Sequence, residues 1–373
     1  MSKRVCMGNE AIALGAARAG VSVVSGYPGT PSTEIIETLI REKIPGIEVQ
    51  WSTNEKAALE VAAGAAYSGA RSMVTMKQVG LNVAADPLMS LSYVGVEGGM
   101  VVVVADDPGP WSSQTEQDTR HFAKYSNLPV FDPSSPEEAY EMVSYAFDLS
   151  EEFRLPVFLR PTTRVCHASA TVDLADVHEP RPASGFVKRP DWIIFPALSY
   201  RKHGELEQKQ KLLSEKFGTL PFNKIKKGGR SGIAVSGISY LYLTEVIREF
   251  GLDLTVFKVG TPYPIPTKPA EEFLSLVDRV LVIEELDPVI EEQLLILSAG
   301  KKEILGKMTA HLPCNGEYSF ELIRDAVLKF ACVRSEDLPM AEIPVLPVRP
   351  PVLCAGCPHR ASFYAAKTAA KNF

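Results

Sequence analysis

The sequence has 373 residues, which is too long for one ordinary core and suits two domains, and 46% of its residues are hydrophobic. Charged residues make up 23% and the net charge is −6, so no basic surface for nucleic acid or anionic lipid is expected. No signal peptide is evident, and the longest apolar run, around Met100–Ala105, is too short to cross a membrane. We therefore expect a cytoplasmic globular protein that binds neither nucleic acid nor membranes.

Between residues 9 and 161, short β-branched runs alternate with segments of helical spacing. The predicted strands are Val21–Ser25, Glu48–Ser52, Ser72–Met76, Met100–Ala105, Pro129–Phe131 and Pro156–Arg160, and the predicted helices include Pro31–Arg41, Glu55–Tyr67 and Pro136–Phe153. Ser135 before the last of these helices is a typical N-cap. The alternation predicts an α/β domain with a doubly wound parallel sheet over residues 1–172.

The second half of the chain is less uniform. Residues 173–230 are rich in Pro and Lys and have little periodicity, which predicts a linker or a surface wrap. Strand and helix patterns resume over residues 231–335 and predict a smaller α/β domain. Residues 336–373 contain a proline-rich run that predicts an extended connector, followed by the beginning of another domain.

Polar motifs follow several of the predicted strands, at the sheet edge where ligands bind in open α/β folds. In the segment Tyr27–Thr33, Thr30 could cap a helix that has Pro31 at its first position, and Gly29 would let a ligand approach the backbone. On local signals alone, an ordinary strand-to-helix turn is the favoured interpretation of the same residues. The segment 105–120 is longer and more polar than a connection needs, which is typical of functional loops.

Glu55 lies in the first turn of a predicted helix that is made mostly of small residues. An acid at this position commonly does no more than complement the helix dipole. Position alone therefore leaves two interpretations open, a surface acid and a functional carboxylate. The small residues predict that the helix packs closely against a neighbouring sheet or subunit.

The chain has six cysteines, too few for the disulfide framework of a secreted protein. Only Cys354 and Cys357 are close together in sequence, in a CxxC motif. A zinc ion or an iron–sulfur cluster needs about four ligands. We therefore expect no metal site built from this chain alone.

Five motifs in order carry a resemblance to a known family: GYPGTPSTEI, NEKAALEVAAGAAYSGARS, KQVGLNVAADPL, SSQTEQDTR and LCAGCPHR. They resemble the large subunit of indolepyruvate:ferredoxin oxidoreductase, of the 2-oxoacid:ferredoxin oxidoreductase superfamily. The resemblance implies that the first domain binds the aminopyrimidine of thiamine diphosphate and that residues 231–335 form a transketolase-C-like domain. A later domain that opens at the CxGCPHR motif would bind the diphosphate and its metal.

The resemblance also implies roles for individual residues. Glu55 corresponds to the pyrimidine-side glutamate, whose hydrogen bond to a ring nitrogen favours the imino form that takes the proton from the thiazolium carbon. Thr30 would lie near the 2-oxo group of the substrate. The residues expected to line or flank the cofactor are Pro28, Gly29, Gln78, Gly80 and Asn82. Indolepyruvate relatives often carry histidine where Gln78 stands.

One departure from the family bears on the substrate. Pyruvate-using relatives place an arginine after the fourth strand, whereas this sequence has Asp106 and Asp107 after Ala105. This favours an aryl 2-oxoacid such as indolepyruvate, oxidised to its acyl-coenzyme A with electrons passed to ferredoxin. Only 13 residues follow Arg360, so Mg²⁺ and [4Fe-4S] clusters are expected from a further segment or from a partner, either a β subunit or a second copy.

Two alternative functions stay open at this point. The chain could be the pyrimidine-binding subunit of a non-oxidative 2-oxoacid decarboxylase, although such subunits usually lack a second α/β domain. It could also be a non-catalytic assembly protein that kept this domain, although a scaffold has no need of Glu55.

Overall fold

The computed structural model describes residues 2–180, 182–333, 345, 347, 353 and 355–372. The chain divides into two units, Met1–Val333 and Arg334–Phe373, and each is described by itself. The proline-rich run at 343–352 and Cys354 lie almost wholly outside the described residues. No described helix is long and apolar enough to cross a membrane.

The apolar runs of the first half form a six-stranded sheet with the order β3-β2-β4-β5-β7-β6, in which every pairing is parallel. Its strands are β2 (Val23–Gly26), β3 (Glu48–Trp51), β4 (Ser72–Lys77), β5 (Met100–Ala105), β6 (Val130–Phe131) and β7 (Val157–Leu159). Every residue of β5 is buried, as expected for a strand covered on both faces.

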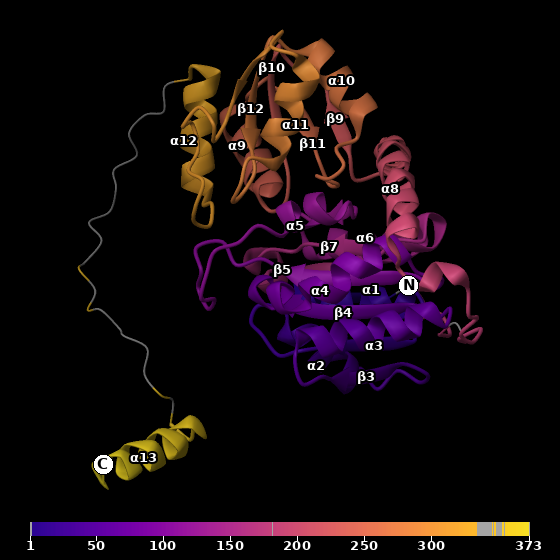
Figure 1. Cartoon of the computed structure of the whole chain (residues 1–373). Helices are drawn as coiled ribbons and strands as arrows, with labels where there is room; N and C mark the ends of the chain where they lie inside the picture. Colours follow the sequence, from indigo (N-terminus) through magenta and orange to yellow (C-terminus); the bar gives the residue numbers. More distant parts are fainter. Residues whose placement is uncertain are drawn as a thin grey trace. The chain divides into compact units, whose positions relative to one another are not determined.

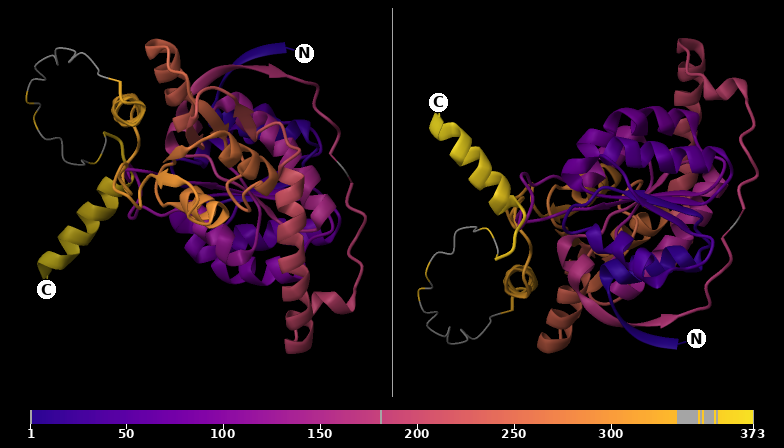
Figure 2. Two further views of the ribbon diagram at one scale, coloured as in Figure 1. Left: turned by 90° about the horizontal axis from the view of Figure 1, so that it is seen from above. Right: turned by 90° about the horizontal axis from the view of Figure 1, so that it is seen from below.

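Helices cover both faces of this sheet (Figure 2). The helices of this half are α1 (Gly8–Arg18), α2 (Thr33–Glu42), α3 (Glu55–Tyr67), α4 (Gln78–Val94), α5 (Thr119–Ser126), α6 (Pro136–Phe153) and α7 (Thr163–His167). Helix α1 packs against α6 and α2, and α3 packs against α4. A Cβ atom on Gly15 of α1 would lie 2.6 Å from the Tyr140 carbonyl oxygen, so α1 and α6 approach closely. The predicted doubly wound α/β architecture is confirmed.

Two strands at the borders of this layer were not predicted. Strand β1 (Ser2–Met7) pairs antiparallel with β8 (Ser169–Leu174) in a separate two-stranded sheet. Their polar, half-exposed residues lack the apolar runs that identify the other strands. The pair joins the beginning of the first layer to its end.

A second sheet follows, with the order β13-β12-β10-β11-β9, and only β9 runs antiparallel to its neighbour. Its elements are β9 (Lys224–Lys226), β10 (Ser231–Val235), α9 (Ser239–Phe250), β11 (Thr255–Lys258), α10 (Thr267–Leu276), β12 (Arg279–Ile283), α11 (Val289–Ser298), β13 (Glu303–Leu305) and α12 (Phe320–Ala331). Two separate apolar cores lie on its two faces, one with α9 and α12 and the other with α10 and α11. Figure 1 shows this layer beside the first.

The segment 173–230, predicted as a linker or a surface wrap, contains regular structure that its low periodicity did not indicate. It contains the short helix η1 (Pro190–Trp192), the 22-residue helix α8 (Pro196–Phe217) and β9. Only Leu206, Leu213, Ser214 and Phe217 of α8 are buried, so its apolar stripe is too thin to stand out in the sequence. The unit Arg334–Phe373 contains α13 (His359–Ala369) and η2 (Ala370–Asn372).

Candidate active site

Glu55 is the first residue of α3, and three residues separate it from the end of β3 at Trp51. The side chain of Asn54 accepts a hydrogen bond of 2.9 Å from the Ala57 backbone N–H and so caps the helix. Ser25 Oγ of β2 donates to the Ala58 carbonyl at 2.6 Å, which fixes the first turn of α3 against the sheet. The half-buried Glu55 side chain is therefore held at the carboxyl edge of the sheet.

Gly80 lies directly against the Glu55 carboxyl group. A Cβ atom on Gly80 would lie 2.4 Å from Glu55 Oε1 and 2.8 Å from its Cδ, closer than real Cβ atoms come. Any side chain at position 80 would displace the carboxyl group or the helix. Two residues that the sequence placed in separate motifs are thus brought into contact.

Gln78, the first residue of α4, is 2% exposed. Its Nε2 donates to the Thr115 carbonyl at 3.0 Å. Its Oε1 is buried and has no hydrogen-bond partner within the described part of the chain. A buried acceptor without a donor is costly, which makes it a candidate for bonding a ligand.

The segment Tyr27–Thr33 forms a turn before α2. The helix begins at Thr33, not at Pro31 as predicted, and Thr30 does not cap it. Instead Thr33 Oγ1 accepts a hydrogen bond of 2.9 Å from the Gly29 backbone N–H. Pro28 and Thr30 are exposed on this turn, so both face away from the core.

The long loop between β5 and α5 contacts three of the predicted site residues. Ser112 Oγ donates to the Thr30 carbonyl at 3.1 Å, and the Thr115 carbonyl accepts from Gln78. Gln117 Oε1 accepts a bond of 3.0 Å from Asn82 Nδ2. The loop therefore connects the turn before α2 with the first turns of α4.

The same loop is attached to the second sheet layer. Glu116 Oε1 accepts hydrogen bonds of 2.7 Å from the backbone N–H groups of both Gly109 and Gly316. Arg164 of α7, which is not part of the loop, also contacts this layer and pairs with Glu317 at 2.7 Å. The loop between β5 and α5 thus contacts the predicted site residues and is also hydrogen-bonded to the second sheet layer.

Sequence reasoning did not single out Lys77, the last residue of β4. A Cβ atom on Gly29 would lie 3.2 Å from Lys77 Cδ, so the lysine stem passes over the glycine of the turn. Within the described residues, the Lys77 ammonium group makes no ion pair and no hydrogen bond, and the residue is half-buried. The sequence feature that could have identified Lys77 as a site residue is its position at the end of β4.

Asp106 and Asp107, just after the end of β5, are both buried. Asp106 Oδ2 accepts from Arg160 Nε at 2.7 Å and from the Thr119 backbone N–H at 3.0 Å. Burial raises the pKa of Asp106, against the opposing effect of Arg160. These contacts show that Asp106 belongs to an internal charge cluster and does not face a ligand.

That charge cluster joins the two sheet layers through Arg120 of α5. Its guanidinium is fully buried and bonds Asp118 Oδ2 and Glu284 Oε2, each at 2.6 Å, and the Glu285 carbonyl at 2.7 Å. Burial acts to raise the pKa of Asp118, but Arg120 and Arg160 outweigh it and hold that pKa well below its usual range. Burial raises the pKa of Glu285 to about 7.

Among the described residues, no group of three or more His, Cys, Asp or Glu side chains could hold a metal ion. In the CxxC motif, Cys357 Sγ lies 3.4 Å from His359 Nδ1, and Cys354 is outside the described residues. The role of this motif therefore stays a prediction from the resemblance.

Comparison with known proteins bears on the first domain and its fold. Residues 14–190 match the family described as "Pyruvate flavodoxin/ferredoxin oxidoreductase, thiamine diP-bdg". Residues 14–190 therefore resemble the thiamine-diphosphate-binding domain of this class of oxidoreductases. Two solved structures share the fold. They are the 2-oxoglutarate:ferredoxin oxidoreductase of Magnetococcus marinus (TM-score 0.70, 17% identity, 88% of this chain and 65% of that one) and a split gene transketolase (TM-score 0.58, 15% identity, 88% and 98%).

The resemblance predicted from the motifs is confirmed over nearly the whole chain. Indolepyruvate oxidoreductase subunit IorA of Methanothermobacter thermautotrophicus is 42% identical over 99% of this chain and 61% of its own length. The corresponding subunit of Pyrococcus horikoshii is 41% identical over 99% of this chain and 60% of its own. The chain is similar to these oxidoreductase subunits over nearly its whole length, and it spans about three fifths of the length of these curated relatives.

Proposed function

We propose that the chain is a subunit or part of a thiamine-diphosphate-dependent 2-oxoacid:ferredoxin oxidoreductase that acts on an aryl 2-oxoacid such as indolepyruvate. The products would be carbon dioxide and the acyl-coenzyme A, with electrons passed to ferredoxin. The observation that carries the proposal is the Glu55 carboxyl group, held against Gly80 at the carboxyl edge of the first sheet. Relatives of 41–42% identity bear the name indolepyruvate oxidoreductase.

The residues at this edge fit the aminopyrimidine of the cofactor. Glu55 offers a carboxylate to a ring nitrogen, and the buried Oε1 of Gln78 offers an acceptor to an amino group. When bound, thiamine diphosphate would supply the carbanion that attacks the 2-oxo carbon. Glu55 would hold the proton on the ring nitrogen, and Gly80 would leave room for the carboxylate to do so. Gly29, Pro28 and Asn82 would border the same space.

The substrate would lie beside the turn that contains Thr30, with Lys77 as the cation for its carboxylate. Lys77 is half-buried beside Gly29, where an unpaired ammonium group attracts an anion. Trp111, next to the Ser112 that bonds Thr30, is 71% exposed and offers an aromatic face. An aryl side chain of the substrate suits such a surface.

Other components would come from outside the residues described. Mg²⁺ for the diphosphate and [4Fe-4S] clusters for electron transfer would be supplied by a further segment or by a partner, either a β subunit or a second copy. We also place the enzyme in the cytoplasm. A non-oxidative decarboxylase subunit and an assembly protein are less well supported, because the relatives at 41–42% identity are named as oxidoreductase subunits.

The test is Glu55→Gln in the assembled enzyme, with Glu60→Gln as a matched control on the same helix. Glu60 is exposed and lies beyond the first turn. Glu55→Gln should lower indolepyruvate-dependent dye reduction by at least about 100-fold, because the proton on the pyrimidine is no longer held by a carboxylate. Glu60→Gln should leave the rate unchanged, and both variants should melt like the wild type. More than a tenth of the wild-type rate in Glu55→Gln would refute the proposal.

A further inference from the structure

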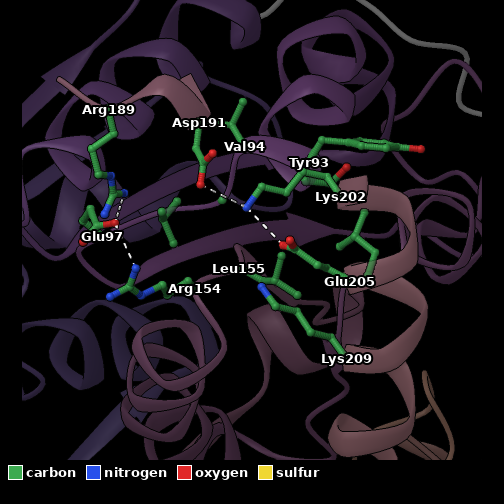
Figure 3. A pocket seen from close by; sticks show the side chains of 14 residues that line it. Tyr93, Val94, Glu97, Arg154, Leu155, Arg189, Asp191, Lys202, Glu205 and Lys209 are labelled. Carbon is green, nitrogen blue, oxygen red and sulfur yellow. Dashed lines mark hydrogen bonds and ion pairs between the residues drawn. The ribbon is translucent and has the colours of Figure 1, made fainter. Parts of the chain in front are cut away.

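A cavity lies at the opposite edge of the first sheet, away from Glu55. Its floor is the segment from Ser92 to Glu97, just before β5, and Arg154 and Leu155, just before β7. Because these strands are parallel, residues before them lie at the amino edge and the candidate active site lies at the carboxyl edge. Helix α8 and the residues around η1 close the cavity from outside (Figure 3).

The cavity is lined by more cations than carboxylates. The cations are Arg154, Arg189, Lys202 and Lys209, and the carboxylates are Glu97, Asp191 and Glu205. Arg154 and Arg189 both pair with Glu97, and Lys202 lies between Asp191 at 3.7 Å and Glu205 at 3.1 Å. Arg201, outside the lining, makes further pairs with Asp191 and Glu205. Every carboxylate of the lining is thus already shared between two cations.

Among the described residues of the lining, Lys209 is the cation that forms no ion pair with these carboxylates. In the part of the chain that the structure describes, its amino group has no ion pair and no hydrogen bond, and Figure 3 draws it beside Leu155 without an interaction. Burial lowers the pKa of Lys209 and the neighbouring Lys202 lowers it further, against the opposing effect of Glu205. An unpaired, half-buried ammonium group is unfavourable unless a counter-charge joins it.

A second donor in the same lining also lacks an acceptor. Arg189 Nε is buried and has no hydrogen-bond partner among the described residues, although its guanidinium stacks on Trp192 at 4.7 Å and pairs with Glu97. Arginine can donate five hydrogen bonds and accepts none, so a free donor here calls for an acceptor atom. Both unmet needs, a negative charge and an acceptor oxygen, are met by one kind of ligand.

We infer that this cavity binds a small oxyanion, a phosphate or a carboxylate, with Lys209 as its direct counter-charge. The cavity volume of about 260 Å³ is ample for a group of phosphate or acetate size. The bound anion would tie α8 and η1 to the amino edge of the sheet. This site is independent of the proposed reaction.

The test compares full-length wild type with Lys209→Met and with Lys211→Met. Lys211 is an exposed lysine on the same helix, so the control makes the same charge change outside the cavity. Inorganic phosphate and acetate are titrated separately against chloride at constant ionic strength, and thermal unfolding is recorded. We expect at least one anion to raise the Tm saturably, by about 2 °C at ten times its Kd, in the wild type and in Lys211→Met. In Lys209→Met its Kd should be at least about tenfold weaker, because the direct counter-charge is gone.

Response to phosphate alone would assign a phosphate group as the ligand, and response to acetate alone would assign a carboxylate. Equal responses in wild type and Lys209→Met, or no saturable response of the wild type to either anion, would overturn the inference. Because the readout is stability rather than turnover, failure here would not affect the proposed role of Glu55.

Discussion

Gly80 on α4 and Glu55 on α3 are so close that a single methyl group on Gly80 would lie 2.4 Å from Glu55 Oε1. Gly80→Ala should therefore displace the carboxyl group from its place at the sheet edge. We expect a loss of at least about tenfold in 2-oxoacid-dependent dye reduction, since small misplacements of a reacting group are costly. The melting temperature should change little, because alanine favours the helix by up to about 1 kcal/mol and offsets part of the clash.

The matched control is Gly64→Ala on α3, where an added Cβ atom would meet nothing within 4 Å. This variant should keep full activity and unfold at the same or a higher temperature. If Gly80→Ala were as active as Gly64→Ala, the close packing of Gly80 on Glu55 would have no bearing on catalysis.

Lys77→Met probes the proposed cation for the substrate carboxylate. We expect the KM for the 2-oxoacid to rise about 10- to 100-fold, with a smaller effect on kcat. This range corresponds to the loss of one charge-assisted hydrogen bond of about 1.5–3 kcal/mol. Lys56→Met is the control, because Lys56 is exposed and pairs with Asp86 at 2.8 Å. Steady-state kinetics distinguishes the two, and an unchanged KM in Lys77→Met would exclude the assigned role.

Arg120→Met tests the buried connection between the two sheet layers. The change leaves Glu284 buried without its arginine and leaves Asp118 with Arg160 alone, and we expect the free energy of unfolding to fall by about 3–5 kcal/mol. Lys124→Met on the same helix breaks an exposed pair with Glu292 and should cost less than about 1 kcal/mol. Denaturant unfolding measures both, and similar losses in the two variants would contradict the cluster's importance.

Glu285 predicts a pH dependence of stability. Burial raises its folded pKa to about 7 from the usual 4.5, so between these values the folded state holds a proton that the unfolded state has lost. The free energy of unfolding should therefore decrease as pH rises from about 4.5 to 7, with a contribution from Glu285 of up to about 3 kcal/mol. Glu285→Gln should remove this contribution. If the free energy of unfolding of Glu285→Gln had the same pH dependence as that of the wild type, the prediction would be contradicted.

The first layer was largely predictable because its signals are local. The valine run of β5 and the capped helix α6 have the bounds that their residues predict, Met100–Ala105 and Pro136–Phe153. Helix α8 was missed because its charged residues hide a stripe of few buried side chains. Strands β1 and β8 were missed because their pairing joins residues far apart in sequence, which no local pattern encodes.

The site was predictable only in part. The strand-end positions of Glu55, Gln78 and Thr30 follow from the alternation of strands and helices, but their roles came from the resemblance. The contact of Gly80 with Glu55 depends on how α3 packs against α4, and no spacing rule contains it. The bonds from Ser112 and Gln117 depend on the course of a loop without periodicity.

That loop has a consequence for protein engineering. Between its contacts with Thr30 and the start of α5 it bonds Gly316 through Glu116, and it then leads into Arg120, which bonds Glu284. A grafted or truncated first layer that ends before residue 230 would lose both partners while keeping its sheet. Such a fragment could retain its core and still present a misplaced loop. The smallest fragment that keeps this loop in place therefore includes the second sheet.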